Sequence, residues 1–196
     1  MSNTKTAPTQ KRAIETQHYF SNLEHEIVRK LHDEAASDFG REELIRSTGI
    51  QDPGLIEELG KLGVTADGLI TLRLFPLVLV AWAEKNVDSK ERETVMAEAQ
   101  RIGIREDSTA GILLDQWLQV RPPGLCVDAW KRYMHELFRG MSGVAQQRLI
   151  LLTQKQMTSV AKASGGILGF GKISSKEKAI IHQVISAMRQ QTQTHA

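Results

Sequence analysis

Apolar residues recur along most of the chain at the spacing of one face of an α-helix. The sets with this spacing are Phe20, Leu23, Ile27 and Leu31; Leu55, Leu59 and Leu62; and Val127, Trp130, Met134, Leu137 and Phe138. Intervals of three and four residues place side chains on one side of a helix, and no comparable stretch alternates with the period of two typical of β-strands. The pattern predicts an all-α fold, a compact helical bundle.

Local start and stop signals agree with this prediction. Asp52 followed by Pro53 is typical of a helix N-cap with proline in the first turn. Gly63 and Gly140 stand where the C-terminal caps of the preceding helices belong.

The longest apolar stretch, residues 69–83, contains Arg73 and Pro76. It is shorter than the roughly 20 residues that a membrane-spanning helix requires, so we expect a buried core helix. The chain opens without a signal-peptide pattern, and its single cysteine, Cys126, cannot form an internal disulfide and is expected in the core. We therefore expect a cytoplasmic protein.

The ends of the chain differ from its middle. Residues 1–15 and 191–196 are polar and lack an apolar period, so we predict disordered tails. The strongest break between them is Arg-Pro-Pro-Gly at 121–124. It separates helical regions 16–121 and 124–190, which form either two subdomains or one domain throughout.

One pattern occurs twice. Residues 80–83 match 160–163 and residues 87–92 match 173–178, with a second loop that is six residues longer; the two predicted hairpins span about 69–104 and 143–190. In each copy a capping residue, Asp88 or Ser174, precedes a glutamate by three positions, Glu91 or Glu177, which is a capping box. The apolar stripe after it also repeats, as Val95, Ala99 and Ile102 and then as Ile181, Ile185 and Met188. Two unrelated hairpins with common capping chemistry remain the alternative.

The segment Val80 to Ile104, VAWAEKNVDSKERETVMAEAQRIGI, resembles the signature of TerB-like helical domains. These occur in bacterial tellurite-resistance proteins and in the N-terminal region of a membrane-anchored DnaJ-type co-chaperone. The resemblance implies a TerB-like all-α fold and a role in stress-response or membrane-associated complexes rather than an established enzyme activity. It also implies metal binding by acidic residues of the turn.

The family's metal motif falls on Glu84, Asp88 and Glu91. The family's Asp is Glu84 here and its Gly is Lys85, which places a cation in the site. Ca²⁺ and Mg²⁺ prefer six or more oxygen ligands, and a capping box already engages two of these side chains, so capping alone is favoured over a divalent cation. The second copy retains only Glu177 of this set.

The second loop, residues 165–172, is rich in glycine. Gly166, Gly171 and Lys172 fit the phosphate-loop spacing, but Ile173 replaces the Ser or Thr that holds Mg²⁺ and a helix precedes the loop, so no nucleotide is expected. Its apolar side chains either tuck onto the body or dock a partner; these are Ile167, Leu168 and Phe170.

Positive charge is concentrated toward the C-terminus although the formal net charge is only +2. From residue 141 onward seven Lys or Arg residues face one acidic residue. Arg148, Lys155 and Lys162 recur every seven residues as one helical stripe that leads toward the further lysines Lys172, Lys176 and Lys178. The stripe is either a solvated face or a contact for an anionic membrane surface or an acidic protein patch. His18, His25 and His32 also recur every seven residues, about 10.5 Å apart, which is too far for a shared metal.

We therefore expect a non-enzymatic TerB-like interaction module with a protein partner and without nucleic acid or a resident cofactor. The alternative is a peripheral binder of anionic membrane or acidic protein surfaces through the basic C-terminal third. An enzyme ranks third, because no nucleophile has a recognisable base and no metal-ligand spacing is convincing.

Overall fold

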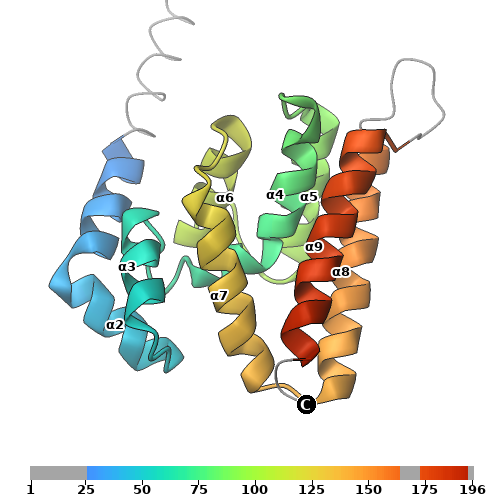
Figure 1. Ribbon diagram of the computed structural model, residues 1–196. Helices are drawn as coiled ribbons and strands as arrows, with labels where there is room; N and C mark the ends of the chain where they lie inside the picture. The colour runs from blue at the N-terminus through green and yellow to red at the C-terminus, as the bar shows by residue number, and fades with distance from the viewer. Residues whose placement is uncertain (1–25, 164–172, 194–196) are drawn as a thin grey trace, which may run out of the picture.

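The computed structural model describes residues 26–163 and 173–193, and within these residues the chain is helical and contains no strand (Figure 1). Residues 26–36 form a helix that precedes α2. The later elements are α2 (Asp38–Thr48), α3 (Pro53–Lys61), η1 (Leu69–Leu74), α4 (Phe75–Ala81), η2 (Trp82–Glu84), α5 (Ser89–Arg101), α6 (Thr109–Gln119), α7 (Leu125–Arg139), α8 (Gly143–Ala163) and α9 (Ser175–Gln193). The prediction of an all-α bundle is confirmed.

Side-chain caps begin several of these helices, because the first backbone N–H groups of a helix lack intrahelical partners. The side chain of Asp52 accepts hydrogen bonds from the N–H groups of Gly54 and Leu55, as the sequence predicts. Gly63, which follows α3, has a φ of 70°, and Gly140 is the C-cap of α7 with an ordinary φ of −86°. The predicted helix ends are therefore in place.

The apolar stretch 69–83 is mostly buried, apart from the exposed Ile70, but is not one helix. It forms the 3₁₀ helix η1, the short α4 and the start of η2. Pro76 lies in the first turn of α4, where its missing N–H leaves no helix hydrogen bond unmade, so the proline starts an α-helix instead of continuing one. The single core helix expected from the sequence is wrong in this respect.

One hydrophobic core joins both parts of the chain. It extends from Leu44 in α2 to Met188 in α9 and includes residues from both sides of the break at 121–124. α4 packs against α8 and α9, α5 packs against α8, and α7 contacts both α3 and α9 (Figure 1). The two predicted regions therefore share a single core.

The structure also bears on the predictions for the cysteine, the chain ends, the histidines and the membrane. Cys126 is fully buried, as predicted. α9 continues to Gln193, so residues 191–193 are helical, whereas residues 1–15 and 194–196 lie outside the described residues. His32 is half-buried beside Gly63, while His18 and His25 are outside the described residues. None of the described helices has the length and apolar character needed to cross a membrane.

Candidate functional site

The three acidic residues of the predicted metal motif lie where η2 leads into α5, in a segment we call the first capping turn (residues 84–91): Glu84 ends η2, Asp88 is the N-cap of α5 and Glu91 lies in its first turn. Asp88 Oδ1 accepts a hydrogen bond from the Glu91 N–H at 2.8 Å, and Glu91 Oε2 accepts one from the Asp88 N–H at 2.9 Å. This confirms the predicted capping box. Lys85 has a φ of 77°, a left-handed conformation that favours glycine.

The second capping turn, residues 173–177, repeats this hydrogen bonding. Ser174 Oγ accepts from the Glu177 N–H at 3.2 Å, and Glu177 Oε2 accepts from the Ser174 N–H at 2.6 Å. The glutamates of both boxes are buried, with Glu91 3% and Glu177 2% exposed. Carboxylates are rarely so buried, and each box supplies a backbone N–H as hydrogen-bond donor.

The two capping turns lie at the same end of the bundle and contact each other (Figure 1). Lys176 Nζ of the second turn donates to Glu84 Oε2 of the first at 3.0 Å. Hydrogen bonds from Ser174 and then from Lys176 hold the pKa of the Glu84 carboxyl below its usual range. Glu84 therefore links the two turns as an anion.

Glu91 has the opposite electrostatics. Its pKa is raised to about 7, chiefly by burial and also by the nearby carboxylates of Asp88, Glu177 and Glu84, and the hydrogen bond from the Asp88 N–H offsets part of this rise. Glu91 therefore exchanges its proton near neutral pH.

These residues do not fit a divalent cation. The Lys176 ammonium forms an ion pair with the Glu84 carboxylate. The capping box already uses one oxygen of Asp88 and one of Glu91 as hydrogen-bond acceptors. No group of three or more His, Cys, Asp or Glu side chains suited to a metal exists in residues 26–163 and 173–193. Glu84, Asp88 and Glu91 thus lie in one turn, where hydrogen bonds hold Asp88 and Glu91 to each other and join Glu84 to Lys176 of the second capping turn.

The predicted basic stripe lies on the exposed face of α8. Arg148, Lys155 and Lys162 are all exposed, and none forms an ion pair with a described residue. Large apolar side chains accompany them: Val144 is 64%, Leu151 62% and Leu152 39% exposed. Of the other predicted partner-binding residues, Lys176 and Lys178 are exposed on α9, whereas Ile167, Leu168, Phe170 and Lys172 lie outside the described residues.

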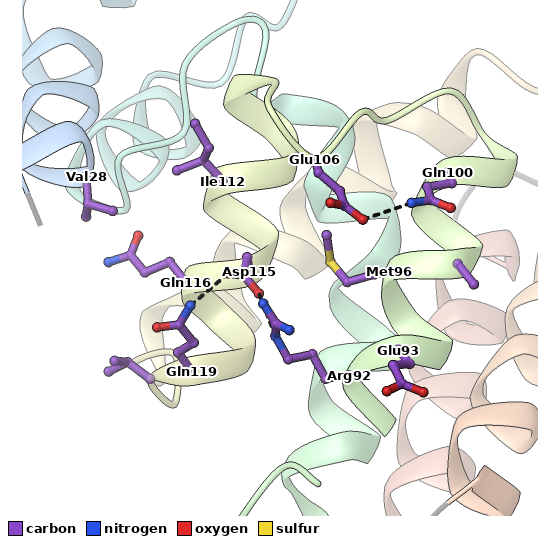
Figure 2. A pocket seen from close by; sticks show the side chains of 12 residues that line it. Val28, Arg92, Glu93, Met96, Gln100, Glu106, Ile112, Asp115, Gln116 and Gln119 are labelled. Atoms are coloured by element: carbon purple, nitrogen blue, oxygen red, sulfur yellow. Dashed lines mark hydrogen bonds and ion pairs between the residues drawn. The ribbon is translucent and has the colours of Figure 1, made fainter. Parts of the chain in front are cut away.

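A groove of about 510 Å³ runs between α5 and α6, and we call it the α5–α6 groove (Figure 2). Its walls are tied together across the gap, because Arg92 Nη2 contacts Asp115 Oδ1 at 2.6 Å and Gln100 Nε2 donates to Glu106 Oε1 at 3.0 Å. Gln119 Nε2 also donates to Asp115. The polar groups that line this groove are largely satisfied by one another.

A second groove, of about 580 Å³, lies where η1 meets α7 and α8, and we call it the α7–α8 groove. Its lining is mostly apolar: Ala66, Leu69, Ile70, Leu137, Met141, Ala145, Leu149 and Leu152. The polar side chains are Arg73, Tyr133 and Arg148, so the lining contains two cations and no carboxylate.

Neither arginine of the α7–α8 groove forms an ion pair among the described residues, although Arg73 is half-buried. Burial raises the pKa of Tyr133, and the positive charge of Arg73 offsets part of this effect. Arg73 therefore presents a positive charge in this groove with no carboxylate partner among the described residues.

This groove is not predictable from the sequence. Its residues come from three segments far apart in the chain, and no local pattern joins them. The one available signal was Arg73, a cation within the longest apolar stretch, which the sequence alone shows only as an interruption.

Comparisons with known proteins do not assign a function to these sites. A scan against protein-family models, a search of curated proteins and a search of solved structures each found no match.

Proposed function

We propose that this chain is a non-enzymatic helical interaction module that binds an acidic protein surface through the exposed face of α8. The observation that supports this most directly is the composition of the helix: α8 carries three exposed cations and exposed apolar side chains, and it contains no acidic residue. A partner surface with carboxylates and a small apolar patch is complementary to it.

The cations of α8 differ from those of α2, α3 and α7, each of which lies within 4 Å of a carboxylate. Lys61, for example, lies 2.6 Å from Glu57 one turn earlier in α3. Such pairs are unavailable within α8, so Arg148, Lys155 and Lys162 keep their charge free for a partner. Leu151 lies between the cations and adds apolar area that water covers in the free protein.

A non-enzymatic role agrees with the state of the single cysteine. Burial raises the pKa of Cys126 to about 12, so its thiol is neither accessible nor ionised near neutral pH. The resemblance of residues 80–104 to TerB-like domains, which act within complexes, also supports an interaction module.

Site-specific photo-crosslinking in cells tests the proposal. A photoreactive amino acid at Leu151 should give a discrete protein adduct, and the double variant Lys155→Glu, Lys162→Glu should lose it by charge repulsion. The matched control carries the photoreactive residue at Ile45, which is 45% exposed on α2, far from α8 (Figure 1). Equal adducts at both positions, or an adduct that survives the charge reversal, would contradict the proposal.

A second candidate function is peripheral binding to an anionic membrane, favoured by the same mixture of exposed Val144 and Leu151 with cations on one helix. Each Lys or Arg near an anionic surface contributes about 1 kcal/mol. Co-sedimentation of the full chain with phosphatidylglycerol–phosphatidylcholine vesicles tests this candidate, with pure phosphatidylcholine as control. Retention that the double charge reversal and Leu151→Ser both abolish would favour the membrane over a protein partner.

A further inference from the structure

We propose that the α7–α8 groove receives an amphipathic helix of the partner protein, with Arg73 binding an acidic side chain of that helix. The inference rests on the proposed function and names the site and the partner's chemistry. The groove adjoins the exposed face of α8, because Arg148 and Leu152 belong to both.

The shape of the groove favours a helix. Tyr133 and Leu137 lie one turn apart on α7, and Ala145, Leu149 and Leu152 follow one another at helical spacing on α8. Two helices present such rows as ridges with a trough between them, and a third helix packs its own ridge into a trough of this kind.

Apolar side chains of the lining supply the contact area. Leu69 and Ile70 of η1 line the groove together with residues of α7 and α8, and Ile70 and Leu152 are 38% and 39% exposed. These are among the few large hydrophobic side chains exposed in the described residues. A leucine-rich helix face would cover them.

The charges select an acidic partner. Arg73 is half-buried within an otherwise apolar lining and has no carboxylate partner among the described residues. A Glu or Asp on the incoming helix would neutralise it in a site partly shielded from water, where a charge-assisted hydrogen bond is strong. Tyr133 lies in the same lining and adds a hydroxyl group that can donate to the same carboxylate.

The α5–α6 groove is a weaker candidate for the same role. Asp115 is already bound by Arg92 and Gln119, and Glu106 is bound by Gln100, as Figure 2 shows. A ligand there would have to displace these contacts, whereas Arg73 has no carboxylate partner in the part of the chain that the structure describes.

The test uses the full chain and a fluorescein-labelled, 18-residue amphipathic peptide with leucines on one face and glutamates beside them. A second peptide carries lysine in place of glutamate. Fluorescence anisotropy should show saturable binding of the acidic peptide only. Arg73→Gln and Ile70→Asp should each weaken it roughly tenfold, since one removes the positive charge and the other places a carboxylate in the lining of the groove.

Two controls keep loss of binding separate from loss of fold. Arg121→Gln removes an exposed arginine in the loop after α6, outside the groove, and should leave affinity unchanged. Circular dichroism melting of each variant verifies that the helices remain formed.

Each other outcome overturns the inference in a recognisable way. Binding that Lys155→Glu, Lys162→Glu weakens but Arg73→Gln and Ile70→Asp do not would assign the partner to the exposed face of α8 alone and leave the proposed function standing. No binding of the acidic peptide would also overturn the inference, while the crosslink at Leu151 tests the function independently. A dimer that Ile70→Asp dissociates in light scattering would make a second copy the occupant, and competitive displacement of the peptide by palmitate would make it a fatty carboxylate.

Discussion

The two capping turns share one hydrogen-bonding scheme and differ in charge. In both, the glutamate three residues after the cap reaches back to the cap's N–H and is buried. The first turn has an aspartate cap, so that two carboxylates of one box lie side by side, whereas the second has a neutral serine cap followed by Lys176. The same local geometry is therefore built once with repelling charges and once without.

This difference separates the stabilisation that a capping residue gives from the free-energy cost of burying the glutamate. Capping is a local gain that either Asp or Ser supplies. Burial of Glu91 among Asp88, Glu177 and Glu84 is a tertiary cost, seen in a pKa raised to about 7. The Lys176–Glu84 pair offsets part of the negative charge at this end of the bundle. Substitutions can separate these contributions.

The largest effect is expected from Glu91→Gln. Glutamine keeps an oxygen that accepts from the Asp88 N–H but cannot ionise, so it removes the cost of a buried charge. At pH 8 the variant should be more stable than the parent by on the order of 3 kcal/mol, as a folded pKa near 7 against an unfolded value near 4.5 implies. Urea unfolding from pH 4.5 to 8 measures the difference.

The stability of the parent protein should depend on pH through the proton on Glu91. Between pH 4.5 and 7 the folded state holds the Glu91 proton that the unfolded chain releases, so stability of the parent falls as pH rises and levels off above 7. The advantage of Glu91→Gln should therefore vanish near pH 4.5. Glu93→Gln, at an exposed position of the same helix, is the matched control. A pH-independent advantage would contradict the assignment.

A smaller effect is expected from removing the caps. Ser174→Ala should cost about 1 kcal/mol, within the usual range for a lost N-cap. Asp88→Ala loses the same hydrogen bond but also removes a negative charge beside Glu91, so at pH 8 its cost should be lower. Equal losses in chemical denaturation would show that Asp88 does not repel Glu91, and no loss in either variant would refute both caps.

Lys176→Gln should change stability by no more than about 0.5 kcal/mol, because both partners of the Lys176–Glu84 pair are substantially exposed. Its signature is salt dependence: the difference from the parent should shrink as salt screens the pair. A loss of several kcal/mol in the free energy of unfolding that persists in 1 M NaCl would contradict this and would indicate that the pair is needed to hold the two capping turns together.

Calcium should have the smallest effect. Millimolar Ca²⁺ is expected to leave the melting temperature within about 1 °C of its value in chelator, because Lys176 and the capping hydrogen bonds hold the oxygens a cation would need. A large stabilisation that Glu84→Gln abolishes would instead restore the metal site implied by the TerB-like resemblance.

Features set by neighbouring residues were predictable from the sequence. The capping boxes at Asp88 and Ser174 follow a four-residue rule, and the burial of Cys126 follows from its apolar surroundings. The division of residues 69–83 into a 3₁₀ helix and an α-helix near Pro76 is not predictable, because an apolar run has the same pattern in both kinds of helix.

Features set by tertiary packing were beyond the sequence. Nothing local to Glu91 indicates that Glu84 and Glu177 lie near it, and nothing local to Arg73 indicates a groove shared with α7 and α8. The basic stripe of α8 was predictable because seven-residue spacing is itself helical, but its lack of ion-pair partners within residues 26–163 and 173–193 depends on which neighbours face it.

The packing of α4 on α8 also bears on how the chain acquires its fold during synthesis. The two helices end about 80 residues apart, yet each buries side chains of the other. At roughly 5–20 residues per second, α4 leaves the ribosome roughly 4 to 16 s before α8 is complete, and α9 follows later still. During that interval Phe75, Leu77 and Val78 lack the part of the core that α8 and α9 supply, so the nascent chain exposes apolar surface that the complete fold covers.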